Sequence, residues 1–472
     1  MSFRTEFLQH CRDAQLVGAQ VSVFSGDDYQ LDLAYGLASL AGEKPVTLET
    51  IFRIASISKI VVAMAVLQLV EKQLVGLDDD IGSILGFNIR NPHHPDKKIT
   101  IRMLMTQTSS ITDGPEDDSR AGYNNVNGTY RPATLRDLLV PNDGKYYTNK
   151  TWLAAVPGEA FNYSNFGCGI LACIVEKVTG EYFTDYVAKN ILRPLGLDAS
   201  FRADEIKNKA AIANLYYGPE NGGFKLSRSG ESFIASVYPH FPLGENYRGP
   251  AGGLFISMRD LMKIARLLVN DGVVSGHRVL EKDTVDQMLQ LQWYGVSENY
   301  RAKGLQLRFM DFDGKTFKGH TGSAYGAISY LFINREEKLG ICFITNGGKY
   351  RPGTVMCDVQ ENIFRSFLNH YWPKQEREHV FSAAFGSAAG MLDDRVIRFS
   401  FPLELKDDDV YLPITNVADI FNIVPDAASG DVILRFRGRE YVAVTPMLSL
   451  REVCATFNAG IRLENGKIEI RY

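Results

Sequence analysis

The chain has 472 residues, of which 45% are hydrophobic and 22% charged, with a formal net charge of -4. This balance is typical of a globular protein with a substantial core, and the length favours two domains. A weakly negative chain offers no broad basic surface to nucleic acid or to an anionic membrane. The composition therefore favours a small molecule or a short peptide as the binding partner, with no nucleic acid and no membrane.

Neither the cysteines nor the histidines form a metal-binding pattern. The six cysteines are scattered, with no C-x-x-C pair and no histidine at zinc-like spacing. We therefore expect buried thiols in a reducing compartment, and neither a metal nor a cofactor. The first twenty residues mix charged with apolar side chains, and no later stretch has the roughly 18 uncharged residues of a membrane span. These features predict a cytoplasmic protein, unless the sequence is that of a trimmed precursor.

The first part of the chain mixes helical and strand-like patterns and then becomes strand-rich. From the spacing of apolar residues and the positions of glycine and proline we expect, in chain order, a helix over 3–17, a β-hairpin over 21–35, a buried helix over 54–75, helices over 165–178 and 258–269, an antiparallel meander of strands at 317–320, 327–333 and 339–345, and a helix over 355–371. The charged stretch 374–378 then marks a boundary. The predicted domains are residues 1–373 and 379–472.

The C-terminal segment reads as a small module of strands with a weak internal repeat. Residues 410–423 and 441–461 each pair a strand with a short apolar helix. The pattern resembles the copper amine oxidase N-terminal-like domain, a likeness that rests on soft hydrophobic motifs and implies no copper site. We expect a small α+β module that could mediate homo-oligomerisation.

A serine and a lysine at short spacing begin the predicted helix after Ala55. In the sequence Ser56-Ile57-Ser58-Lys59 the first and last residues are three apart, so they share one face of a helix. An alcohol attacks an acyl group well only when a base takes its proton, and an amine can do so. This S-x-x-K pattern alone arises easily by chance, so its weight depends on further motifs.

A second motif, Tyr163-Ser164-Asn165, lies about a hundred residues later at the start of a predicted helix. There a phenol can relay protons and an amide can reach a substrate.

A third motif, His320-Thr321-Gly322, ends a predicted strand and is followed by Ser323. A substrate laid along this strand could form main-chain hydrogen bonds, and Gly322 allows close approach. The backbone N–H groups of Ser56 and Ser323 are natural donors to an oxyanion.

In this order and on these predicted elements, the three motifs resemble the serine β-lactamase and penicillin-binding-protein superfamily, and its class C-like branch in particular. That branch has a tyrosine in the middle motif. Matching flanking sequence lies at Ile51–Ala55, Leu104–Ser109 and Gly252–Leu254, and the likeness covers roughly residues 5–372. The resemblance implies an α+β fold, with an antiparallel sheet flanked by helices, a helical subdomain and a cleft between them.

The resemblance also implies roles for the motif residues. Ser56 would be the nucleophile, Lys59 its activating base, and Tyr163 the general base and acid. Asn165 would bind the substrate amide, while His320, Thr321 and Gly322 would line the cleft, and the N–H groups of Ser56 and Ser323 would form the oxyanion hole. His320 replaces the lysine of the β-lactamase motif, so permanent charge for a lactam carboxylate is lost unless this histidine is protonated.

The tyrosine and histidine motifs together resemble D-alanyl-D-alanine carboxypeptidases, D-aminopeptidases and esterases of the same fold. The sequence therefore favours a serine hydrolase of small amides, peptides with or without a D-residue, or esters, and ranks β-lactamase activity lower. A catalytically idle relative that binds ligands or partners is the further alternative, because each motif taken alone also has a purely structural interpretation.

Two segments stay open between functional and structural interpretations. The stretch Tyr216–Tyr247 either shapes an acyl pocket or covers the core as an irregular insertion, with the second slightly favoured. The segment Asp113–Asn127, acidic and then rich in Asn and Gly, could border the cleft, but sequence does not orient it.

Overall fold

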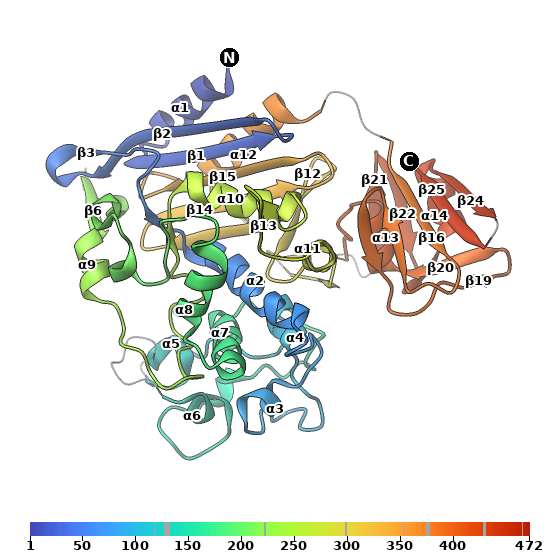
Figure 1. Ribbon diagram of the computed structural model, residues 1–472, viewed down its shortest axis with the longest axis horizontal. Helices are drawn as coiled ribbons and strands as arrows, with labels where there is room; N and C mark the ends of the chain where they lie inside the picture. Colours follow the sequence, from blue (N-terminus) through green and yellow to red (C-terminus); the bar gives the residue numbers. More distant parts are fainter. Residues whose placement is uncertain are drawn as a thin grey trace. The chain divides into compact units, whose positions relative to one another are not determined.

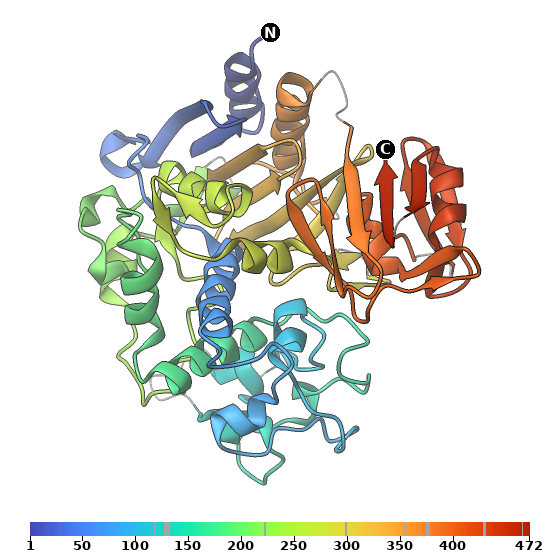
Figure 2. The same cartoon turned by 45° about the vertical axis from the view of Figure 1, so that its right-hand side comes forward.

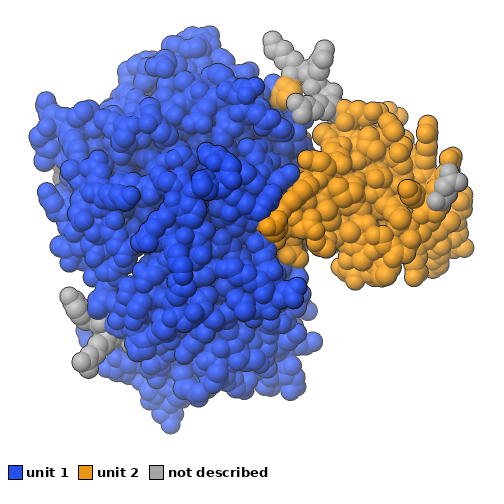
Figure 3. All heavy atoms as spheres, viewed as in Figure 1, with its two compact units in different colours: residues 1–280, 319–372 blue, residues 281–318, 373–472 orange. Residues whose placement is uncertain are grey.

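The computed structural model describes residues 1–472 except 118, 127–132, 221–222, 298–299, 354, 374–377, 428–430 and 465. The chain divides into two compact units, residues 1–280 with 319–372 (unit 1) and residues 281–318 with 373–472 (unit 2) (Figure 3). Residues 281–318 thus belong with the C-terminal segment, which the sequence did not indicate. The domain limits 1–373 and 379–472 stay a prediction, and most of the expected linker, 374–377, lies outside the described residues.

Unit 1 is built on an antiparallel sheet, as expected for the α+β class (Figure 1). Its strands lie in the order β13 (Lys315–Ala324, of which 319–324 belong to this unit), β14 (Ala327–Asn334), β15 (Leu339–Thr345), β1 (Gly18–Ser25), β2 (Tyr29–Ser39) and β3 (Lys44–Pro45). The predicted hairpin and meander are confirmed. The turn after β13 is shorter than expected, because the strand continues to Ala324 and only Tyr325 and Gly326, with φ of 55° and 89°, reverse the chain.

Helices cover both faces of this sheet. Val21 and Phe24 of β1 are three residues apart, so their side chains point to opposite faces. Val21 shares its face with Tyr330, through Phe343 between them, and Tyr330 contacts α12 (Asp358–Tyr371), which lies beside α1 (Phe3–Asp13) (Figure 2). Phe24 lies 4.6 Å from the guanidinium of Arg266 in α10 (Met258–Val269), so α10 covers the other face.

The helical part of unit 1 contains α2 (Ser58–Glu71) and α7 (Asn165–Thr179), which pack against each other. The expected helix over 54–75 is shorter than predicted and begins with a 3-10 turn, η2 (Ala55–Ile57). Nearly every side chain of α2 is buried, as an all-apolar helix requires. Among the described residues, the remaining α-helices and strands of unit 1 are α3 (Ile81–Leu85), α4 (Ile101–Thr106), α5 (Gly122–Val126), α6 (Leu135–Leu139), α8 (Phe183–Val187), α9 (Gly230–Ala235), β4 (Phe52–Arg53), β5 (Leu215–Glu220), β6 (Gly223–Arg228), β7 (Phe255–Ile256), β8 (Val273–Val274) and β9 (His277–Arg278).

Unit 2 has its own core, to which residues 281–318 contribute Leu291, Ala302 and Phe309. This shared core explains why that segment groups with the C-terminal residues. Its elements are α11 (Lys282–Leu289), β10 (Trp293–Tyr294), β11 (Ala302–Lys303), β12 (Arg308–Phe312), β16 (Val380–Ala384), β17 (Ala389–Leu392), β18 (Arg395–Arg398), β19 (Leu405–Lys406), β20 (Asp409–Pro413), α13 (Ile414–Ile420), β21 (Val432–Phe436), β22 (Arg439–Ala443), β23 (Met447–Ser449), α14 (Leu450–Phe457), β24 (Gly460–Glu464) and β25 (Lys467–Arg471).

The weak repeat of unit 2 corresponds to two strand and helix pairs. In each, a strand leads directly into a helix, β20 into α13 and β23 into α14, and the two strands pair antiparallel. The likeness of this module to the copper amine oxidase N-terminal-like domain stays a prediction. Among the residues that the structure describes, no helix has the length and apolar character needed to span a membrane.

Candidate active site

Ser56 lies on a strained turn between β4 and α2. Its neighbour Ala55 has a φ of 51°, in the left-handed region that residues other than glycine rarely adopt. Such a conformation persists only where surrounding contacts enforce it. Here the Ile54 N–H donates to the Leu254 carbonyl at 3.0 Å, and the Ser58 hydroxyl donates to the Ala55 carbonyl at 2.6 Å. The turn leaves the Ser56 side chain half-buried at the start of the helical segment.

Lys59 is fully buried one helical turn after Ser56 and directs its amine at three oxygens. Its Nζ lies 3.1 Å from Ser56 Oγ, 2.8 Å from Asn165 Oδ1 and 2.7 Å from the Ala251 carbonyl oxygen. The structure thus brings Ser56 and Lys59 together, as their spacing predicts. When the amine is neutral, the Ser56 hydroxyl can transfer its proton to Lys59 Nζ across this distance of 3.1 Å.

Tyr163 and Asn165 reach this group from the start of α7. Ser164 caps the helix, since its Oγ accepts from the Gly167 N–H at 2.9 Å, and this places the residues on either side of it beside Lys59. The Tyr163 ring centre lies 4.8 Å from Lys59 Nζ. The structure therefore joins the second motif to the first, which sequence could only infer from resemblance.

The third motif completes the group from β13. The His320 ring centre lies 6.1 Å from that of Tyr163, and His320 is 1% exposed. Gly322 passes directly beside the turn that carries Ser56, because a Cβ atom at this position would lie 2.5 Å from the Ile54 carbonyl oxygen. Only glycine permits that approach.

The two flanking residues of this motif complete its description. Thr321 is half-buried and Ser323 is exposed at the end of the strand. The roles expected for Thr321, Gly322 and Ser323 in binding substrate and an oxyanion stay predictions.

Sequence reasoning missed the role of Asp113, a carboxylate that organises the second motif. Its Oδ1 accepts hydrogen bonds from Ser164 Oγ at 3.0 Å and from the Phe166 N–H at 2.8 Å, and its Oδ2 accepts from Asn165 Nδ2 at 2.9 Å. With Nδ2 held in this way, the Asn165 oxygen faces Lys59. The only sequence signal was an acidic residue a few positions after the Leu104–Ser109 motif, which does not reveal a contact across 52 residues.

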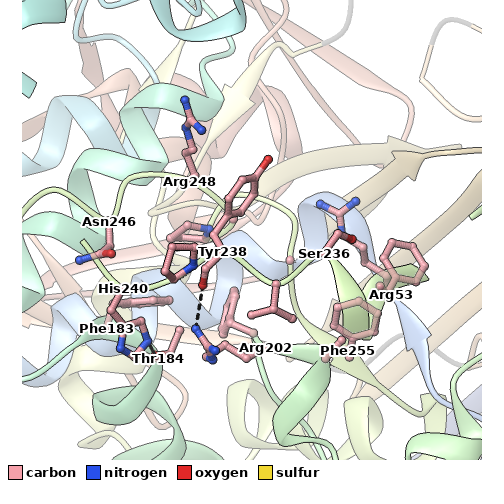
Figure 4. Close-up of a pocket in the computed structure, with 18 of the residues that line it drawn as sticks. Arg53, Phe183, Thr184, Arg202, Ser236, Tyr238, His240, Asn246, Arg248 and Phe255 are labelled. Carbon is pink, nitrogen blue, oxygen red and sulfur yellow. Dashed lines mark hydrogen bonds between the residues drawn. The ribbon is translucent and has the colours of Figure 1, made fainter. Parts of the chain in front are cut away.

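A cavity of about 240 Å³ is lined by residues that are close in sequence to the first and third motifs. Arg53 precedes Ser56 by three positions, Tyr325 follows Ser323 by two, and Gly253 follows the loop that holds Lys59. Much of the remaining wall comes from the stretch Tyr216–Tyr247, which contains β6 and α9. In Figure 4 the side chains of Arg202 and Arg248 lie on opposite sides of Tyr238.

Among the described residues, no three His, Cys, Asp or Glu side chains gather as a metal site would require. All six cysteines are free thiols. For Cys168 and Cys173, burial raises the pKa of each thiol above its ordinary value, so neither is poised to act as a nucleophile.

Comparison with known proteins identifies related sequences. The family model described as Beta-lactamase matches residues 5–359. Penicillin-binding protein 4 of Amycolatopsis lactamdurans is 27% identical over 359 residues, which cover 74% of this chain and 84% of that protein. Protein flp of Staphylococcus aureus (strain MRSA252) is 28% identical over 359 residues, which cover 75% of this chain but only 63% of that protein.

Solved structures share the fold at low sequence identity. D-amino acid amidase from Ochrobactrum anthropi SV3 has a TM-score of 0.58 at 20% identity and covers 78% of this chain and 99% of its own. The octameric penicillin-binding protein homologue from Pyrococcus abyssi has a TM-score of 0.59 at 19% identity and covers 100% and 99%. Class C beta lactamase from Rhodobacter sphaeroides has a TM-score of 0.57 at 19% identity and covers 78% and 98%. With a family model matched over most of its length and all three motifs in one cluster, the chain belongs to the beta-lactamase family.

Proposed function

We propose that the chain is a serine hydrolase that cleaves small amides, short peptides or esters through an acyl-enzyme on Ser56. The observation that carries the proposal is the contact of Lys59 Nζ with Ser56 Oγ at 3.1 Å, beneath the ring of Tyr163 at 4.8 Å. A nucleophile with a base in hydrogen-bond reach and a second proton carrier beside it is the arrangement that acyl transfer needs.

In the proposed reaction, neutral Lys59 takes the Ser56 proton while Oγ forms a bond to the acyl carbon. The N–H groups of Ser56 and Ser323 stabilise the negative charge on the carbonyl oxygen. The bond to the leaving group then breaks, and Tyr163 delivers a proton to that group. Water attacks the acyl-enzyme and gives one proton to Tyr163. The bond between Ser56 Oγ and the acyl carbon then breaks, the acid is released, and Lys59 returns its proton to Ser56 Oγ.

Asn165 has a divided role in this scheme. Its oxygen accepts from Lys59 and one Nδ2 hydrogen is given to Asp113, so the second Nδ2 hydrogen is the donor that would reach a substrate carbonyl. His320 and Thr321 line the cleft. His320 is a buried imidazole at the position where β-lactamases have a lysine, so a permanent positive charge for the carboxylate of a β-lactam is lost. We therefore rank amides and esters above β-lactams as substrates.

The fold of D-amino acid amidase suggests D-amino acid amides as a first substrate class to test. The test is hydrolysis of paired D- and L-amino acid amides, p-nitrophenyl acetate and nitrocefin by wild type and Ser56→Ala. We expect amide or ester hydrolysis that Ser56→Ala abolishes. Hydrolysis of nitrocefin alone would move the assignment to β-lactamase, and hydrolysis of nothing would move it to a binding protein.

We further propose that the chain assembles as a homo-oligomer through residues 379–472. A penicillin-binding protein homologue of the same fold, described as octameric, supports this proposal. Light scattering coupled to size exclusion should give a mass that is a multiple of the 52.7 kDa chain. A monomeric mass at micromolar concentration would contradict it.

A further inference from the structure

The cavity beside Ser56 has a cationic wall formed by Arg53 and Arg228 around the ring of Tyr325. The two guanidinium carbons lie 4.9 Å and 5.2 Å from the centre of that ring. Burial alone would raise the pKa of Tyr325, but the two adjacent guanidinium groups hold it below its ordinary value. Two positive charges therefore converge on one phenol.

Neither of these arginines forms an ion pair with a carboxylate among the residues that the structure describes. Arg202, which also lines the cavity, differs because Asp204 and Glu205 pair with it. The carboxyl of Glu176 on the same wall already accepts from the Phe183 and Gly244 N–H groups, at 3.1 Å and 2.7 Å. The wall around Tyr325 thus has positive charge that the protein itself does not neutralise.

An apolar surface lies next to this charge. The rings of Phe233 and Phe255 are 5.1 Å apart in an edge-to-face pair, and Phe233 is 6.3 Å from Tyr325. A ligand with a short apolar chain that ends in an anion matches this combination, since the chain would pack on the rings and the anion would meet both guanidinium groups.

The cavity is close enough to Ser56 to take part of a substrate. Arg53 is three residues from Ser56, and an extended chain spans at most about 3.6 Å per residue, so their α-carbons are within about 11 Å. Tyr163, the proposed proton donor to the leaving group, does not line the cavity. Ser56 does not line the cavity either, but Arg53 ties the cavity wall to the Ser56 turn. We assign a substrate group in the cavity to the acyl portion, and the test below separates this portion from the leaving group.

We propose that the Arg53, Arg228 and Tyr325 wall binds a carboxylate at the end of the acyl portion of the substrate. This inference rests on the proposed hydrolase function and narrows its substrate class to acyl groups with an apolar chain and a terminal carboxylate. It also gives the stretch Tyr216–Tyr247, which supplies Arg228 and Phe233, the acyl-pocket role that the sequence left open.

The test compares two esters of equal chain length, p-nitrophenyl hydrogen adipate and p-nitrophenyl hexanoate. Wild type should have a kcat/KM for the adipate ester about tenfold above that for the hexanoate ester, and Arg228→Gln should reduce this ratio about tenfold. The ratio should also decrease as sodium chloride rises from 20 to 500 mM, because salt screens an exposed charge pair. Lys225→Gln, which removes a positive charge from the same strand without lining the cavity, is the matched control and should keep the wild-type ratio.

Three results would overturn the inference. An equal ratio in wild type and Arg228→Gln would show that the arginines only stack on Tyr325. A preference for 3-carboxy-4-nitrophenyl hexanoate over the adipate ester would place the carboxylate on the leaving group. If wild type hydrolyses no ester, calorimetric titration with adipate tests the wall by itself, and equal affinity of wild type and Arg228→Gln would overturn the inference. The proposed function fails only if the amino acid amides are not hydrolysed either.

Discussion

The Asp113 carboxylate accepts a hydrogen bond of 2.9 Å from Asn165 Nδ2, and this contact decides which end of the Asn165 side chain faces Lys59. An amide has one acceptor oxygen and one donor nitrogen, so holding the nitrogen leaves the oxygen for Nζ. We expect Asp113→Asn to lower kcat about 10- to 100-fold with little change in KM, because a second amide would compete to turn Asn165 around. Steady-state hydrolysis of a p-nitrophenyl ester measures both constants.

The matched control for Asp113 is Asp137→Asn. Asp137 also holds a helix start, as part of the capping box of α6, but it is remote from the motifs. Its loss should cost about 1 kcal/mol of stability and leave kcat unchanged. Equal loss of kcat in both variants would mean that Asp113 acts only as a helix cap.

Gly322 provides a steric test of the approach between β13 and the Ser56 turn. Adding a Cβ atom 2.5 Å from the Ile54 carbonyl oxygen must push the strand away from the turn that carries Ser56. We expect Gly322→Ala to lower kcat/KM about 100-fold or more while the far-ultraviolet circular dichroism spectrum is kept. In Gly223→Ala the new methyl group meets no atom within 4 Å, so that variant should keep wild-type activity; retention of activity in Gly322→Ala would contradict the close packing.

Lys59 should be indispensable as a base and not merely as a positive charge. In Lys59→Arg the guanidinium stays protonated and cannot accept a proton from Ser56, so we expect a loss of about 1,000-fold or more in kcat. Lys72→Arg, a change at the other end of α2 where Nζ contacts the Tyr186 hydroxyl at 3.3 Å, should leave kcat unaltered. Substantial activity in Lys59→Arg would exclude an amine base.

The sequence predicted those site residues whose positions follow from the periodicity of a helix or a strand. The spacing of Ser56 and Lys59 required only helix geometry, and the strand that carries His320 followed from its apolar pattern. The roles of Asp113 and Arg228 were not predicted, because their partners, Asn165 and Tyr325, are distant in sequence and no periodicity links them. Tertiary contacts also explain unit 2, since Leu291, Ala302 and Phe309 join a core whose other buried members follow residue 380.

A buried carboxyl in unit 2 gives a prediction about stability. Burial raises the pKa of Asp419 to about 6, although its Oδ1 accepts from the Leu291 N–H at 2.8 Å. The pKa of this carboxyl is near 4 in the unfolded chain and about 6 in the folded protein. Its contribution to the free energy of unfolding is therefore fully present below about pH 4 and is lost as the pH rises through about 6.

We therefore expect Asp419→Asn, which stays neutral, to be more stable than wild type at pH 8, by roughly 1–3 kcal/mol. At pH 4 the two proteins should unfold alike in urea. Asp283→Asn, a change at an exposed carboxyl of the same unit, should follow wild type at both pH values. If the difference in stability between Asp419→Asn and wild type does not vary with pH, the raised pKa of Asp419 is not its cause.

The acyl-enzyme on Ser56 is tested most directly by intact-protein mass spectrometry. Wild type and Ser56→Ala are each mixed with p-nitrophenyl acetate and, separately, with a penicillin, and quenched in acid. The proposed function predicts an added acetyl or penicilloyl mass on wild type alone, and its lifetime measures deacylation. An adduct on both proteins, or no adduct and no turnover with either reagent, would contradict Ser56 as the nucleophile.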